Sequence, residues 1–217
     1  MVRGLWTPDG ARLIYRDFRP SGDRIVERTL GTGQIRELFS HDGRLNPRDL
    51  SPDGKILLYV ANRSLQYRRI DGAGGPPRQF LDNWGFAQAK FSPDGKWVVY
   101  IAGGERAQIY VQAFPSGGLR TQITPDGGAD PVWRGDGKEI IYRGNSSLYS
   151  VRVETHGSQF KASEPELLFP IRAPRVTADS EIAGISKDGT RILFAQSTIT
   201  DFPPVVYMMT SWGEANR

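Results

Sequence analysis

One short turn recurs five times along this 217-residue chain and constrains its fold more than any other feature. In each copy a large apolar residue precedes two or three turn-forming residues and Asp-Gly, and an apolar run ending in Tyr or Phe follows. The five copies begin at Trp6, Leu50, Phe91, Trp133 and Ile185. In the third copy, FSPDGKWVVY, Pro93 restricts φ, Asp94 can bond its own backbone and Gly95 accepts a positive φ. The repeated element is therefore a tight turn that leads into a β-strand.

The spacing of the copies indicates the class of repeat. Successive Asp-Gly aspartates are 44, 41, 42 and 52 residues apart. An all-strand repeat of roughly 40 to 45 residues is typical of β-propeller blades. Helical repeats need apolar residues three and four positions apart over at least about ten residues, and none of the five segments has that pattern. The 25 glycines and 15 prolines are spread evenly, as expected for many short strands joined by turns.

We therefore predict an all-β fold, a β-propeller of five blades with mostly four antiparallel strands, in a single domain over residues 1–217. The blades are expected at approximately 2–39, 46–81, 87–123, 129–169 and 181–212. The third unit gives the full pattern, with strands at 87–91, 96–102, 107–114 and 119–123. The same division predicts third strands at 24–30, 65–70, 148–153 and 205–212, and fourth strands at 34–39, 78–81 and 166–169. In the fourth unit a longer segment, ETHGSQFKASEP, replaces the short glycine-rich connection.

The two ends of the repeat leave one question of architecture open. The chain opens at a first strand and ends at a third strand. We expect either a three-stranded last blade or a fragment of a larger propeller. An open blade edge in the second case would favour self-association.

The Ser-Pro-Asp-Gly turn and its period, over residues 2–212, resemble the TolB-type propeller repeat, a WD-repeat-like family. The last unit, IAGISKDGTRILFAQ…PPVVYMMTSW, also looks like the terminal blade of propellers fused behind bacterial serine/threonine kinases. No kinase signature is present in the chain. The resemblance implies a bacterial sensing or interaction module and carries over no chemistry.

Composition argues against several functions. The chain has no cysteine, and its net charge of +4 comes without a basic run, which argues against a nucleic-acid partner. No apolar segment is long enough to cross a bilayer. Its two histidines, His41 and His156, fall on different blades, and neither a Gly-x-Ser-x-Gly elbow nor a calcium loop occurs. We expect no catalytic residues, no metal and no cofactor.

No signal peptide is visible, so the cellular compartment stays open. It would be periplasmic or extracytoplasmic if the parent protein is exported or membrane-anchored.

Loops at the mouth of the channel are the first candidate binding residues. In a propeller the loops from fourth to first strands, and from second to third strands, emerge on the usual binding face. The partner-binding residues predicted there are His41, Arg44, Trp84, Phe86, Arg172 and Arg175. The arginines could hold a carboxylate or phosphate, and the aromatic rings could contact a partner. The alternatives are rings that plug the channel and arginines that stay solvated.

First strands line the channel of a propeller and supply the second set. The predicted channel-lining residues are Arg3, Arg48, Asp49, Gln88, Lys90, Asp130 and Glu181. Burying charges of both signs costs free energy unless they pair, so one interpretation is mutual ion pairing and the other is a small-ligand funnel. Asp49, Asp130 and Glu181 are also the only carboxylates placed to serve a glycosidase.

The sequence thus predicts a non-catalytic propeller that binds a protein or peptide and acts as a sensor or scaffold module of a larger bacterial protein. The alternative is a carbohydrate- or small-molecule-binding propeller, glycosidase-like at the extreme, that uses the central channel. In both cases the Asp-Gly turns lie at the opposite end of the first strands, and we interpret their aspartates as turn formers.

Overall fold

The computed structural model describes residues 4–72, 74–82, 88–103, 107–144, 146–171, 181–186, 188–196 and 205–210. These residues form twenty β-strands and contain no helix, which confirms the predicted all-β class. The chain divides into two compact units, Met1–Phe91 and Ser92–Arg217. The boundary between the units falls at the start of the third Asp-Gly turn.

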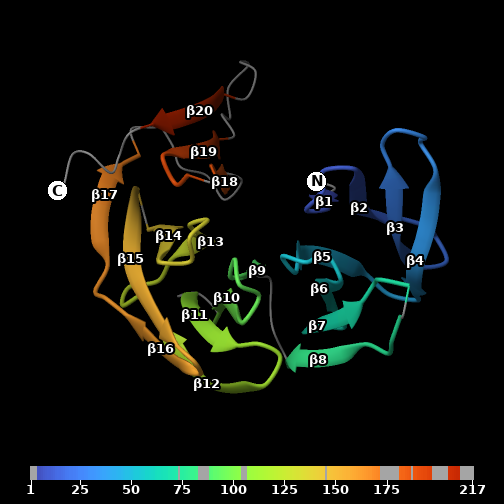
Figure 1. Cartoon of the computed structure of the whole chain (residues 1–217), viewed down its shortest axis with the longest axis horizontal. Coiled ribbons are helices and arrows are strands. Elements are labelled where there is room, and N and C mark those ends of the chain that lie inside the picture. The colour runs from blue at the N-terminus through green and yellow to red at the C-terminus, as the bar shows by residue number, and fades with distance from the viewer. Residues whose placement is uncertain are drawn as a thin grey trace. The chain divides into compact units, whose positions relative to one another are not determined.

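The first unit contains two four-stranded antiparallel sheets (Figure 1). The first sheet consists of β1 (Gly4–Trp6), β2 (Arg12–Asp17), β3 (Asp23–Thr29) and β4 (Ile35–His41). The second consists of β5 (Leu45–Leu50), β6 (Ile56–Ala61), β7 (Ser64–Arg69) and β8 (Arg78–Leu81). In both sheets the strands lie in chain order, as expected for propeller blades.

Three further sheets follow in the chain. The third has the order β9 (Ala89–Phe91), β10 (Trp97–Ala102), β11 (Gln108–Ala113) and β12 (Gly117–Gln122). The fourth contains β13 (Ala129–Trp133), β14 (Glu139–Arg143), β15 (Ser147–His156), β16 (Gln159–Ala162) and β17 (Glu166–Pro170). The fifth has three strands among the described residues, β18 (Glu181–Ile185), β19 (Arg191–Gln196) and β20 (Val205–Thr210).

The fourth sheet departs from the four-strand pattern. Its third strand, β15, is ten residues long, and β17 pairs with the first part of it. β16 pairs with the last part, from Val153 to His156, and so extends β15 into a hairpin. The sequence marked this segment only as a longer connection, and strand β16 was not predicted.

Burial explains why the second strands are continuously apolar. In β6 every residue after Ile56 is buried, and β10 is buried from Trp97 to Ile101. Both faces of such a strand pack, so its sequence loses the polar alternation of a half-exposed strand. In the first unit one core joins the two sheets, with Ile14 of the first packed with Leu57 of the second. The outer strands are mostly exposed.

Each Asp-Gly turn is closed by a hydroxyl and a carboxylate. In the second turn the Ser51 hydroxyl donates to Oδ1 of Asp53 at 2.6 Å and accepts the N–H of Ile56 at 2.9 Å. Oδ1 of Asp53 also accepts the N–H of Lys55 at 3.1 Å, and Gly54 has φ +71°. The first, third and fifth turns repeat these bonds with the pairs Thr7–Asp9, Ser92–Asp94 and Ser186–Asp188.

The fourth turn has Arg134 where the others have a hydroxyl residue. Its guanidinium lies 3.2 Å from Oδ2 of Asp136 and donates to Oε2 of Glu139 at 3.1 Å. An ion pair thus replaces the hydroxyl bond. Oδ1 of Asp136 still accepts the N–H of Lys138 at 3.0 Å, so the backbone path of the turn is preserved.

The glycines of three turns lie against the preceding turn of the same unit. A Cβ on Gly54 would lie 3.0 Å from Cδ of Pro8, and one on Gly137 would lie 3.7 Å from Cδ of Pro93. At Gly189 the nearest atom would be Nε of Arg134 at 2.7 Å. Glycine is needed at these positions for its positive φ and, at Gly54 and Gly189, for close packing.

Two alanine substitutions should separate the free-energy cost of backbone strain from the cost of crowding a neighbouring side chain. Gly10 has φ +68° but no neighbour that its Cβ would meet within 4 Å, whereas Gly54 has φ +71° and Pro8 at 3.0 Å. We expect Gly10→Ala to lower the free energy of unfolding by about 1 kcal/mol through backbone strain. Gly54→Ala should lose roughly 1 kcal/mol more, because Pro8 has to shift. Urea unfolding measures both, and equal losses would contradict the packing of the turns.

Candidate functional site

The first strands of neighbouring sheets contact one another within each unit. β5 contacts β1 and β9 in the first unit, and β13 contacts β18 in the second. Polar residues on neighbouring first strands are therefore brought near one another within each unit. Of the predicted channel residues, Arg48 and Asp49 lie on β5, Lys90 on β9 and Asp130 on β13, and Gln88 immediately precedes β9.

Asp49 joins two first strands. Its Oδ2 accepts the backbone N–H of Phe91 on β9 at 2.8 Å. Burial raises the pKa of Asp49, while the positive charge of Lys90 and the N–H groups of Phe91 and Leu50 act in the opposite direction. Arg48 and Gln88 are half-buried.

Asp130 is held in an unusual conformation within a first strand. Its φ is +56°, which is uncommon for a residue other than glycine. It lies at an irregularity in the pairing of β13 with β14, and the residue is 4% exposed. Nε of Arg143 donates to Oδ2 of Asp130 at 2.7 Å, so the buried carboxylate is paired. Backbone strain of this kind is found disproportionately at functional sites.

His41 organises the connection from β4 to β5. The N–H of Gly43 donates to Nδ1 of the ring at 2.8 Å, and Nδ2 of Asn62 lies 3.3 Å from Nε2. Arg44, three residues along, is exposed. The ring therefore helps to shape the loop that presents Arg44.

Several predicted site residues lie outside the described residues, and their roles stay predictions. They are Arg3, Trp84, Phe86, Arg172 and Arg175. Glu181 is described only as the first residue of β18.

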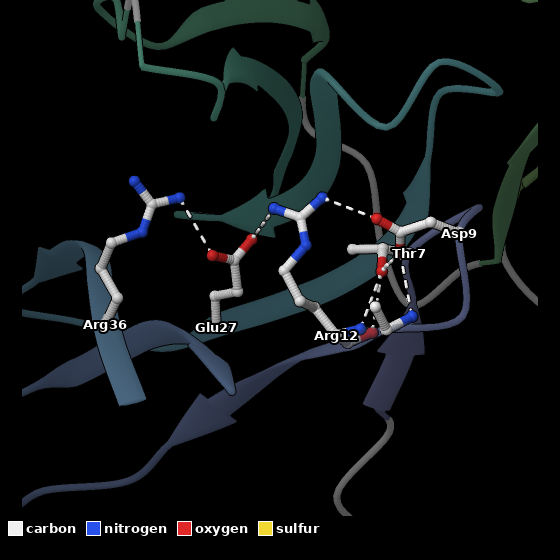
Figure 2. Close-up of polar contacts among 6 residues, drawn as sticks. Thr7, Asp9, Arg12, Glu27 and Arg36 are labelled. Carbon is white, nitrogen blue, oxygen red and sulfur yellow. Dashed lines mark hydrogen bonds and ion pairs between the residues drawn. The ribbon is translucent and has the colours of Figure 1, made fainter. Parts of the chain in front are cut away.

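A charge network on the first sheet was not predicted. Figure 2 shows Glu27 of β3 between Arg12 and Arg36, with Arg12 reaching Asp9 of the first turn. Arg12 and Arg36 donate to the two oxygens of Glu27 at 2.9 and 3.1 Å, and Arg12 also donates to Asp9 at 3.2 Å. Glu27 is only 7% exposed, so its charge depends on these partners. The network stabilises the turn and three strands, and nothing in it points to a ligand.

Metal and membrane features can be judged for the described part of the chain. There, no group of three or more His, Cys, Asp or Glu side chains could hold a metal ion. The described residues also contain no helix that is long and apolar enough to cross a bilayer.

Comparison with known sequences gives little about the chain. No protein-family model matches it. A curated relative, the uncharacterized protein Atu1656 of Agrobacterium fabrum, is 24% identical over 153 residues, which cover 63% of this chain. The matched part is 52% of that protein, so the chain spans about half the length of the curated relative it matches.

Solved structures identify the fold. TolB from Acinetobacter baumannii matches 98% of this chain with a TM-score of 0.72 and 21% identity, over 52% of its own chain. A putative TolB from Agrobacterium tumefaciens matches 98% with a TM-score of 0.69 and 20% identity, over 77% of its chain. An oligogalacturonate lyase in complex with manganese matches 96% with a TM-score of 0.64 and 15% identity, over 64% of its chain.

These likenesses and the five antiparallel sheets define a β-propeller fold of the TolB type, with the sheets as blades. The predicted fold class is confirmed. Because the neighbours include TolB and an enzyme, the fold by itself leaves the activity open.

The turn aspartates predict a loss of stability in acid. The hydroxyl of Thr7 and the N–H of Ala11 lower the pKa of Asp9 to about 2, and Ser186 and Thr190 do the same for Asp188. Because these folded-state pKa values lie below the unfolded value of about 3.9, their stabilisation is complete above about pH 5. It is lost as the pH falls toward 2.

We expect the urea midpoint of the native chain to fall between pH 5 and pH 2. An Asp9→Asn and Asp188→Asn double variant keeps the oxygen acceptors of both turns but cannot titrate there. Its midpoint should fall less steeply over the same range. Identical slopes would contradict the assignment.

Proposed function

We propose that the chain is a non-catalytic binding module, part of the sensing or scaffold region of a larger bacterial protein. It captures a protein or peptide partner at charged residues of β5 and β9 in the first unit and at the loop that precedes β5. One observation carries the proposal: a charged side chain that links these two strands is held by an internal bond. Asp49 of β5 is fixed by the N–H of Phe91 on β9.

A carboxylate that is already fixed suits recognition of a partner. It is pre-organised, so a partner does not have to order it on binding. A surface with placed carboxylates and cations also selects a complementary charge pattern. The TolB-type fold is consistent with such a role, because propellers present the ends of their first strands at the channel.

The alternative, a carbohydrate- or small-molecule-binding channel, is favoured by one feature. Burial raises the pKa of Asp49, and a perturbed carboxyl is a common property of groups that exchange protons. Against this, its contacts with Phe91 and the charge of Lys90 favour the ionised form. A panel of glycans and metabolites read by thermal shift tests the alternative, since specific stabilisation would favour it.

Selection from a displayed peptide library tests the first-strand site. Peptides enriched by the native chain should bind an Asp49→Asn and Lys90→Gln double variant at least 10-fold more weakly, because both placed charges are removed. The Asp53→Asn variant, altered in the Asp-Gly turn that follows β5, should bind them normally. Equal binding by all three proteins would contradict the site.

A second pair of variants tests the predicted mouth residues. Replacing Trp84 and Arg175 together by alanine should weaken capture of the same peptides and leave the far-UV circular dichroism unchanged. Unchanged capture would exclude these two residues from the site and leave the first-strand assignment standing.

A further inference from the structure

A cavity of about 250 Å³ lies in the second unit, lined by the third and fourth Asp-Gly turns. The third sheet contributes Pro93, Asp94 and Trp97 to its lining, and the fourth contributes Trp133, Asp136 and Thr155. These turns follow β9 and β13, and the lining of the cavity includes none of the residues of the first-strand site proposed above. Sequence reasoning missed it because the aspartates were interpreted only as turn formers.

The unpredicted hairpin of the fourth sheet builds one side of this cavity. Thr155 lies in the extended part of β15, and Phe160 lies on β16. The ring of Phe160 packs on Trp97 at 5.1 Å between centroids and on Trp133 at 6.4 Å, nearly perpendicular to the second ring. The sheet that departs from the repeat is therefore the one that encloses the cavity.

Both tryptophans have an unused hydrogen-bond donor. Trp97 is 4% exposed and Trp133 is 8% exposed, and their Nε1 atoms are buried without an acceptor among the described residues. A buried indole N–H ordinarily finds a partner, because leaving it unpaired costs free energy. Both donors belong to side chains that line the same cavity.

The rim of the cavity carries a carboxylate that can take a cation. Asp94 is exposed, and both of its turn bonds, from Ser92 and from the N–H of Lys96, go to Oδ1. Its other oxygen is not used by the turn. Oδ2 of Asp136, by contrast, is 3.2 Å from the guanidinium of Arg134. Asp94 is therefore the carboxylate that remains for a ligand.

We propose that this cavity binds a basic side chain, arginine or lysine, from a peptide segment of a partner protein. The apolar stem contacts Trp97 and Trp133, and the charged head pairs with Asp94. The cavity is smaller than the roughly 300 Å³ at which sites for whole small molecules begin, which favours a single side chain.

The test uses the whole chain and the peptide acetyl-Gly-Ala-Arg-Ala-Gly-amide, with tryptophan fluorescence and calorimetry as readouts. We expect the peptide to bind and to change the fluorescence. The matched peptide with neutral citrulline for arginine should bind at least 10-fold more weakly. Equal affinity for the two peptides, or no binding at millimolar concentration, would overturn the proposal. Arginine amide alone should bind more weakly than the peptide. If the two ligands bound with equal affinity, the occupant of the cavity would be a small cation and not a peptide.

Two equivalent turn variants give a matched control. Asp94→Asn and Asp53→Asn each keep the Oδ1 acceptor for their serine and lysine N–H groups, so their effects on folding should be similar. Only Asp94→Asn should weaken peptide binding, by at least 10-fold, and equal weakening by both would overturn the site. The Asp49→Asn and Lys90→Gln variant should bind this peptide as the native chain does. A failure of the cavity proposal can thus be distinguished from a failure of the proposed first-strand site.

Discussion

The turn in which a serine or threonine hydroxyl bonds an aspartate, followed by a glycine with positive φ, supports the rest of this structure. It reverses the chain between the first and second strands of four of the five sheets and so sets their pairing. The carboxylate of Asp53, for example, holds the Ser51 hydroxyl and the N–H of Lys55 together. Since Gly54 also lies against Pro8, the same turn spaces two neighbouring sheets of the first unit.

The fourth repeat shows what happens when one part of this element changes. Arg134 replaces the hydroxyl, and its ion pairs with Asp136 and Glu139 keep the turn closed. The same arginine lies where a side chain on Gly189 would have to go. The fourth sheet also carries the additional hairpin with Phe160, and it is at this sheet that a cavity opens. Departures from the repeat thus coincide with the feature that most resembles a built binding site.

Most strands could be predicted because their signals are local. The predicted fourth strand at 78–81 has the bounds of β8. The strand predicted at 96–102 differs from β10 by one residue at its start, and the strand predicted at 107–114 differs from β11 by one residue at each end. β16 was missed because its four residues, QFKA, alternate too briefly to indicate a strand. Its formation depends on pairing with the far end of the unusually long β15. Asp49, Lys90 and Asp130 were placed on first strands correctly, but the pairing of Asp130 with Arg143 was not foreseen.

The sequence by itself determined the repeat, the turns and the class of fold, because each turn is closed by bonds between residues no more than five positions apart. The tertiary structure decided which charges pair and which rings meet. Trp97, Trp133 and Phe160 are tens of residues apart in the chain and lie together only because two sheets pack side by side. Asp94 is a turn former by local chemistry. It becomes a candidate ligand of a basic side chain only through the neighbours that packing brings to it.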